Sequence, residues 1–470
     1  MNYDRLDAIV NSYRDEILET LSRWIPVPSV AGARTAENAP FGAENRRMLE
    51  MALEDCRKLG FEVDDVDGFA MSAQMGRGEE TMGILCHLDV VPAGDGWTHN
   101  PWCAEIEDGK LYGRGVADDK GAAVLTMFAM KAVREAGIEL KDGVRLICGC
   151  SEETGMGDMN YYASKRKMPD YGFSPDAEFP VINIEKGGVG LTIGQITGGE
   201  EGAKIPVYEL YGGERQNVVP GKAWARLGVT DREAFEKALD EIRKETGFEL
   251  ISEYKENGEC LLTAIGQSAH ASMPHLGKNA AGMLLIALSK LEAGGGSREA
   301  IKCLAEKIGI EGDGKSLGIA CADEESGALT CNMGIMRYDQ NFLYVTCDCR
   351  YPICADETLI CGNAVRAVSP YRMFVRFNGS HQPHHIPAGH KIVKGLLKAY
   401  HEVTGLEPYT IAIGGGTYSR CMPNTVAFGL NFPGDTDMCH MPDEYMDIEK
   451  MMLSARIIAR AIAELAGKHE

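Results

Sequence analysis

A histidine and an aspartate follow a short apolar run at residues 84–92, in an arrangement that suits a metal ion. The run is typical of a buried strand, and it delivers His87 and Asp89 to the strand's carboxyl end. Residues two apart in a strand share a face, so Asp89 can accept a hydrogen bond from one ring nitrogen of His87. The other nitrogen is then available to a metal ion. The alternative for this stretch alone is a core histidine followed by an aspartate that caps the next loop.

Paired aspartates occur where residues 111–121 pass from an expected strand into an expected helix. Glycines in this stretch permit a tight turn and a close approach of the backbone. Asp118 and Asp119 stand where a helix amino terminus favours negative charge. Taken alone, the pair fits an ordinary acidic N-cap as well as it fits a metal site.

Adjacent glutamates follow another expected buried strand, at residues 149–155. Glu152 and Glu153 repel each other unless cations compensate them or one of them keeps a proton. This arrangement is typical of a metal ligand beside a general base. A similar pair, Glu324 and Glu325, has no apolar strand before it and is interpreted as a solvated turn.

An aspartate and a late histidine complete the candidate set. Asp176 stands just past a short expected strand, and His440 lies near the end of the chain. Two histidines and three carboxylates are what two divalent ions need if one carboxylate bridges them. The five candidate ligands are His87, Asp118, Glu153, Asp176 and His440.

Strands and helices alternate along the first and last thirds of the chain, which indicates an α/β sheet with helices on both faces. Residues 3–21 are expected to form one amphipathic helix, and 120–136 a helix of small and apolar residues. Ligand sites in such sheets lie at the carboxyl ends of strands, where four of the five candidates fall.

The middle of the chain has short strands, charged helices and glycine-rich breaks, which indicate an inserted α+β domain. The expected boundaries are 1–186 for the first part of the catalytic domain, 187–380 for the inserted domain and 381–470 for the second part of the catalytic domain. The predicted fold is thus a mixed-sheet α/β domain with an insertion.

Charge and cysteine content exclude some classes of function. A formal charge of −21 argues against nucleic acid or an anionic membrane as partner, because both are polyanions. No apolar run approaches the roughly 20 residues that cross a bilayer, and the amino terminus lacks the form of a signal peptide. The 15 cysteines sit mostly within apolar runs, which indicates reduced thiols and predicts a cytoplasmic protein.

The ordered motifs resemble the dinuclear metallopeptidase family of aminoacylase, carboxypeptidase G and succinyl-diaminopimelate desuccinylase. They are His-x-Asp, Gly-Arg-Gly-x-x-Asp-x-Lys-Gly, Glu-Glu-x-Gly, Pro-Asp-Ala and a late histidine. The longer sequence stretches around these motifs are most similar to the dipeptidase branch, which contains peptidase V and the Xaa-His or carnosinase-type dipeptidases. Four stretches carry this closer likeness: residues 87–97, 266–274, 414–418 and 432–435.

The resemblance implies two divalent ions per chain, each with its own ligands. Asp118 would bridge both ions, His87 and Asp176 would complete one site, and Glu153 and His440 the other. Glu152 would be the general base and Asp89 would orient His87. A cis peptide bond is implied at Asp118–Asp119. Zinc is the expected ion, with manganese or cobalt as alternatives, since histidine and carboxylate ligands suit all three.

The resemblance also makes the inserted domain a lid that supplies groups for the substrate. His270 would stabilise the oxyanion, Arg350 would bind the substrate carboxylate, and Asn217 would line the pocket. Gly415 and Gly416 would offer backbone groups. One departure from the family pattern is Cys439, a thiol immediately before the metal-binding histidine.

The predicted function is hydrolysis of the peptide bond of small, unblocked dipeptides by a monomer. An N-acyl-amino-acid amidohydrolase is an alternative that needs the same ions and the same Arg350. A catalytically idle peptide-binding protein is a third, against which the intact Glu152 argues. The remaining cluster of His381, His384 and His385 is interpreted as part of a hinge segment rather than a third metal site.

Overall fold

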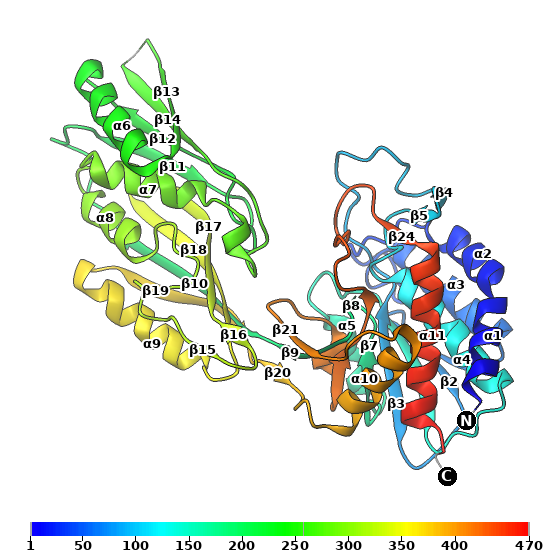
Figure 1. Cartoon of the computed structure of the whole chain (residues 1–470). Coiled ribbons are helices and arrows are strands. Elements are labelled where there is room, and N and C mark those ends of the chain that lie inside the picture. The colour runs from blue at the N-terminus through cyan, green and yellow to red at the C-terminus, as the bar shows by residue number, and fades with distance from the viewer. Residues whose placement is uncertain (1, 257, 469–470) are drawn as a thin grey trace. The chain divides into compact units, whose positions relative to one another are not determined.

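The chain folds into two compact units in the computed structural model, which describes residues 2–256 and 258–468 (Figure 1). Unit 1 comprises Met1–Ile184, His385–Ile411 and Gly416–Glu470, and unit 2 comprises Glu185–His384 and Ala412–Gly415. The short segment Ala412–Gly415, which carries Gly415, thus groups with unit 2, whereas the sequence had placed it in the second part of the catalytic domain.

A mixed sheet of nine strands forms the centre of unit 1. Its order is β1-β2-β6-β3-β7-β22-β9-β20, and β21 pairs with β9. Strand β3 pairs in parallel with β6 and β7. The strands are β1 (Glu62–Val66), β2 (Ala70–Met75), β3 (Thr81–His87), β6 (Gly143–Gly149), β7 (Tyr171–Ser174), β9 (Val181–Glu185), β20 (His384–His385), β21 (Thr410–Ile413) and β22 (Thr425–Ala427).

Two smaller sheets lie beside the main one. One is ordered β24-β5-β4 and the other pairs β23 with β8. Their strands are β4 (Glu105–Glu107), β5 (Lys110–Tyr112), β8 (Ala177–Glu178), β23 (Leu430–Asn431) and β24 (Tyr445–Asp447).

Helix α4 shows how unit 1 positions its candidate site. It follows Asp118 and Asp119 directly, and nearly every side chain along it is buried, as expected for an apolar helix enclosed by other elements. It packs against α1, α2 and α11 and against β3 and β6. The helices of unit 1 are α1 (Tyr3–Ser12), α2 (Arg14–Trp24), α3 (Ala43–Lys58), α4 (Lys120–Glu135), α5 (Gly157–Lys165), α10 (Lys391–Thr404), α11 (Ile448–Ala466) and the 3₁₀ turn η3 (Tyr418–Cys421).

The single helix predicted for residues 3–21 is wrong, because the structure has two helices that meet at Tyr13. The apolar face continues across the junction, with Leu6 and Ile17 both fully buried, so the periodicity gave no sign of a break. The Tyr13 side chain packs on Phe128 and its hydroxyl donates to Glu135, both of α4. The break between α1 and α2 thus falls at a residue that contacts another helix.

Unit 2 is an eight-stranded antiparallel sheet with helices packed against it. The strand order is β13-β14-β12-β11-β17-β18-β10-β19. Alternate side chains of β18 from Leu343 to Tyr351 are fully buried in the core of this unit, the period expected of a sheet with one covered face. The strands are β10 (Gly187–Ile196), β11 (Val207–Gly212), β12 (Lys222–Gly228), β13 (Glu249–Tyr254), β14 (Glu259–Ile265), β17 (Thr330–Tyr338), β18 (Phe342–Tyr351) and β19 (Phe374–His381).

Four helices and a small hairpin complete unit 2. The helices are α6 (Arg232–Thr246), α7 (Ala280–Lys290), α8 (Arg298–Lys307) and α9 (Glu357–Val368), with 3₁₀ turns η1 (Pro274–Leu276) and η2 (Ser369–Tyr371). The hairpin pairs β15 (Ala322–Asp323) with β16 (Gly327–Ala328). Glu324 and Glu325 form its exposed turn, which confirms that this carboxylate pair belongs to a solvated turn.

Candidate metal centre

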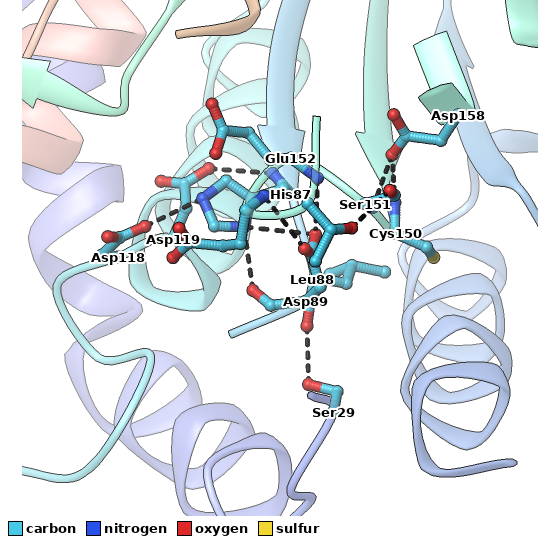
Figure 2. Close-up of polar contacts among 12 residues, drawn as sticks. Ser29, His87, Leu88, Asp89, Asp118, Asp119, Cys150, Ser151, Glu152 and Asp158 are labelled. Atoms are coloured by element: carbon cyan, nitrogen blue, oxygen red, sulfur yellow. Dashed lines mark hydrogen bonds and ion pairs between the residues drawn. The ribbon is translucent and has the colours of Figure 1, made fainter. Parts of the chain in front are cut away.

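His87 stands at the carboxyl end of β3 and is 1% exposed. Its Nδ1 lies 2.8 Å from the main-chain oxygen of Asp89, while the Asp89 carboxylate is 3.5 Å away (Figure 2). The expectation that the Asp89 carboxylate accepts this hydrogen bond is therefore corrected: the carbonyl of the same residue does so. The orientation of the ring is still held by Asp89, and Nε2 is directed away from that contact.

The Asp89 carboxylate instead fixes the pair of glutamates. Its two oxygens accept hydrogen bonds from the main-chain N–H groups of Glu152 at 3.1 Å and Glu153 at 3.2 Å. Asp89 is fully buried. One residue thus orients the His87 ring through its carbonyl and the turn that carries both glutamates through its side chain.

Asp118 lies between the two candidate histidines. Its Oδ1 is 2.8 Å from Nε2 of His87, and its Oδ2 is 3.0 Å from Nε2 of His440. Burial alone would raise the pKa of Asp118, but these contacts lower it overall. The peptide bond Asp118–Asp119 is cis, which confirms the implication of the resemblance. One oxygen toward each histidine is the arrangement that a bridging carboxylate requires.

Two further carboxylates lie beside the histidines. Glu153 Oε1 is 2.9 Å from Nε2 of His440, and Asp176 Oδ2 is 3.6 Å from Nε2 of His87. Contacts with Asp118 and Glu153 raise the pKa of His440 to about 10. The structure therefore brings all five candidate ligands into one place, although His440 comes from the far end of the chain.

The donor atoms fit divalent cations. Potential ligand atoms of His87, Asp118 and Glu153 lie within 4.8 Å of one another, and so do those of His87, Asp119 and Asp176. Among the described residues, no group is in hydrogen-bonding geometry with the buried Nε2 of His87, despite the nearby Asp118 oxygen. A nitrogen directed at carboxylates without such a bond, amid oxygen donors, is typical of a metal site.

Like charges crowd this centre. Burial first, and neighbouring carboxylates next, raise the pKa values of Glu152, Asp119 and Asp176 well above the ordinary range, although His87 opposes the shift. Buried carboxylates in such numbers need either protons or cations. The centre therefore has the electrostatic character of a cation site.

Asp119 is a site residue that the sequence reasoning left out. It is the N-cap of α4 but its side chain makes no capping hydrogen bond, so the N-cap interpretation of the aspartate pair is wrong for Asp119. Its Oδ2 instead accepts a hydrogen bond from the main-chain N–H of His87 at 3.0 Å. The doubled aspartate was the available signal, and local spacing could not show that the second one reaches β3.

A second missed network supports the glutamate turn. Asp158 Oδ2 accepts hydrogen bonds from the main-chain N–H groups of Cys150 at 2.6 Å and Ser151 at 2.7 Å (Figure 2). The hydroxyl of Tyr418 donates to the same oxygen, and the Tyr418 ring stands edge-on to His87 at 6.2 Å. A tyrosine next to the glycine motif thus joins the turn to β3.

The predicted substrate-binding residues divide between the units. His270 has its Nδ1 2.7 Å from the hydroxyl of Ser272, and the Asn217 carbonyl accepts from the N–H of Ala271 at 2.9 Å. Both belong to unit 2, as do Arg350 and Gly415, while Gly416 belongs to unit 1.

Arg350 already has a carboxylate partner within unit 2. Its Nε lies 2.7 Å from Oδ1 of Asp348, and its Nη2 lies 2.8 Å from Oδ2. Asp348 and Arg350 are two residues apart on β18 and therefore share a face of the sheet. This fork holds one edge of the guanidinium and leaves the Nη1 edge for another acceptor.

Cys439 and the cluster of three histidines lie outside the proposed ligand set. Burial raises the pKa of the Cys439 thiol well above its usual value, and nearby carboxylates, Asp118 among them, add to the shift. Neither ligand cluster detected in the described part of the chain contains His381, His384 or His385. The main-chain oxygen of His381 accepts from Tyr351 at 3.0 Å.

Comparisons with known proteins point to one family. The family described as "Peptidase family M20/M25/M40" matches residues 83–464. A putative dipeptidase, YtjP, of Bacillus subtilis is 36% identical, covering 96% of this chain and 98% of the relative. A Beta-Ala-Xaa dipeptidase of Lactobacillus delbrueckii subsp. lactis is 32% identical, covering 98% of each.

A solved structure shows the same fold. Human carnosine dipeptidase 1 superposes with a TM-score of 0.58 at 16% identity, covering 99% of this chain and 98% of that one.

None of the helices in the described ranges has the length and apolar character needed to traverse a bilayer.

Proposed function

This chain belongs to peptidase family M20/M25/M40, and on that premise we propose that it is a metal-dependent dipeptidase that cleaves small, unblocked dipeptides. The observation that carries the proposal is Asp118, whose two oxygens face His87 and His440 separately. Relatives that align over nearly the whole chain are named as dipeptidases, which supports the substrate class.

Two divalent ions would be held around Asp118. His87 and Asp176 complete one set of ligands, and Glu153 and His440 complete the other. Zinc is the proposed ion, with manganese or cobalt as alternatives, because imidazole and carboxylate ligands suit all three. When bound, such ions polarise the scissile carbonyl and lower the pKa of a water molecule.

Glu152 is the proposed general base. Its main-chain N–H donates to Asp89, and it lies next to the proposed ligand Glu153 without belonging to the proposed ligand set. A carboxylate beside the ligands but outside them can accept the proton of the attacking water and deliver it to the leaving amine. Asp89 is a positioning residue in this scheme, because it holds both His87 and the glutamate turn.

Four of the five residues proposed to contact the substrate belong to unit 2, and Gly416 belongs to unit 1. Arg350 would bind the free carboxylate of the dipeptide, since a guanidinium can pair with a carboxylate through two hydrogen bonds. His270 would donate to the developing oxyanion. Asn217 would line the pocket, and Gly415 and Gly416 would offer backbone groups to the substrate.

A cytoplasmic monomer is the proposed context. The described cysteines are free, and most are buried, as suits a reducing compartment. Light scattering on the purified chain measures the mass in solution, and a stable dimer would contradict the monomer.

Comparing free dipeptides with N-acetyl amino acids tests the proposed substrate. The chain, loaded with zinc or manganese, should hydrolyse dipeptides with a kcat/KM at least about tenfold above that for the N-acetyl compounds, the ratio that about 1.4 kcal/mol of differential transition-state binding gives. The reverse preference would instead identify an N-acyl-amino-acid amidohydrolase. No turnover of either, with both ions bound, would indicate an idle binding protein.

A further inference from the structure

A buried glutamate joins the two loops that carry Asp118 and His440. Glu444 is 0% exposed, and its Oε1 accepts hydrogen bonds from the main-chain N–H groups of Gly115 at 3.0 Å, Ala117 at 2.8 Å and Asp118 at 3.2 Å. These three N–H groups converge on one oxygen and form a nest for the carboxylate, while the N–H of Val116 between them donates to the main-chain oxygen of Gly113. The side chain of Glu444 therefore sets the path of the backbone up to the proposed bridging ligand.

Arg114 completes the connection from the other side. It is 1% exposed, and its Nη1 lies 2.6 Å from Oε2 of Glu444. Its Nη2 donates to the main-chain oxygens of Ala93 at 3.3 Å and His440 at 3.4 Å. The guanidinium thus contacts the loop of the proposed ligand His440 and the carboxylate that holds Asp118.

The surrounding backbone reinforces this join. The N–H of Gly113 donates to the main-chain oxygen of Glu444 at 2.9 Å. Immediately after it, β24 pairs antiparallel with β5, with Tyr445 opposite Tyr112. The pairing of β5, which precedes Asp118 in the chain, with β24, which follows His440, therefore aligns two loops that are more than three hundred residues apart in sequence.

A buried ion pair is an expensive way to fill space. Well-packed apolar residues of similar volume are often as stable or more stable, since burying two charges can cost more than their attraction returns. The cost is higher here because the Nε of Arg114 is buried without a hydrogen-bond partner among the described residues. Apolar residues could not, however, satisfy three converging N–H groups and the carbonyl of His440. The contacts of the pair are directed at the two ligand loops and at Ala93.

We propose that Glu444 and Arg114 are positioning residues that fix Asp118 relative to His440 and so set the affinity for the ion bound by His440. This inference rests on the proposed two-ion function. A glutamine at position 444 keeps one oxygen for the N–H nest but presents an amide to Arg114, which leaves a buried guanidinium without its anion. The affinity for the ion held by His87 and Asp176 should change less, because Asp118 is the only one of its ligands that Glu444 and Arg114 hold in place.

The test is a titration of metal-free protein with Zn²⁺ against a competing chelator. Wild type should bind two ions per chain. The Glu444→Gln variant should bind one ion with a Kd raised by about 10- to 100-fold, as expected when the partners that hold metal ligands are removed. The second ion should change less. Arg114→Lys keeps the charge but cannot contact Glu444, Ala93 and His440 together. It should therefore raise the Kd for the same ion.

Glu200 of unit 2 offers a matched control. It is also a buried carboxylate that holds distant backbone, since it accepts from the N–H groups of Val207 at 3.1 Å and Gly295 at 2.6 Å and from the hydroxyl of Tyr338 at 2.7 Å. Glu200→Gln should lower the melting temperature and leave both Kd values within about twofold of wild type, since the site is not touched.

The outcomes separate the inference from the proposed function. Wild-type protein that binds fewer than two ions would contradict the proposed function itself. If wild type binds two ions and both Glu444→Gln and Arg114→Lys bind them with unchanged Kd values, the function stands and the positioning role is overturned. If Glu444→Gln does not fold, Arg114→Lys decides: weaker binding of one ion supports the role, and unchanged binding overturns it.

Discussion

The two units carry chemically reactive side chains under opposite electrostatic conditions. In unit 1, the carboxylates of Asp118, Glu153 and Asp176 are largely buried together, and their ion-pair partners among the described contacts are His87 and His440. In unit 2, Arg350 already has its carboxylate partner, Asp348. The buried carboxylates of unit 1 outnumber their two histidine partners, whereas Arg350 and Asp348 form a one-to-one ion pair. The difference supports the proposed ion site in unit 1.

The largest expected effect comes from Glu152. Replacing it by glutamine removes the proposed base while keeping the size of the side chain, so kcat should fall by about 10²- to 10⁴-fold with ion content unchanged. Glu324, in the exposed turn of unit 2, is the matched control, and Glu324→Gln should leave kcat unaltered. Equal kcat values for the two variants would show that Glu152 is not the general base.

Removing the ions should have the second-largest effect, and its effect on stability should differ between the two units. A chelator should abolish turnover and should weaken unit 1, because a ligand present at 100 times its Kd stabilises the folded state by about 2.7 kcal/mol. Hydrogen exchange should increase in the loops after β3 and before α4, while β18 of unit 2 stays protected. Uniform deprotection of both units would contradict an ion site confined to unit 1.

Arg350 should give a smaller effect that depends on the substrate. A hydrogen-bonded contact with a charged group contributes about 1.5–3 kcal/mol, so Arg350→Ala should lower kcat/KM for a dipeptide by about 10- to 100-fold. A dipeptide amide, which lacks the free carboxylate, should lose much less. Arg226, which pairs with Glu209 and Glu259 in the same sheet, is the control for loss of an ion pair. An equal loss on both substrates would indicate a structural role for Arg350.

Asp348 should give the smallest effect. Asp348→Asn keeps one acceptor for Arg350 but weakens the fork, which is worth about 0.5–1.5 kcal/mol for one net hydrogen bond. KM for dipeptides should rise about 2- to 10-fold with kcat nearly constant. A fall in kcat at unchanged KM would show that the fork does not serve substrate binding.

The parts of the centre that could be predicted are those that lie at the ends of strands. His87 and Glu153 follow apolar runs that the structure shows as β3 and β6, and chain topology brings the ends of parallel strands together. The ordered motifs then indicated the family, which the match over residues 83–464 confirms. The local sequence pattern was sufficient to place a residue where a single strand sets the position of that residue.

The parts that could not be predicted depend on contacts between distant segments. Glu444 stands four residues after His440, but only the folded chain shows that its carboxylate reaches Asp118. Asp89 was expected to use its carboxylate on His87, whereas the carbonyl does so. The break between α1 and α2 likewise falls at Tyr13, whose ring packs on α4. In each case the hydrophobic periodicity of the sequence does not reveal the contact, because it depends on the folded chain.

Ion stoichiometry tests the central claim most directly. Elemental analysis should be made on the wild-type chain and on an Asp118→Ala variant after dialysis against the same free zinc concentration, with folding checked by circular dichroism. A bridging carboxylate predicts two ions per wild-type chain and fewer than one in the variant, since both ions lose a shared ligand. Two ions retained by the variant, or at most one in wild type, would contradict a dinuclear centre built around Asp118.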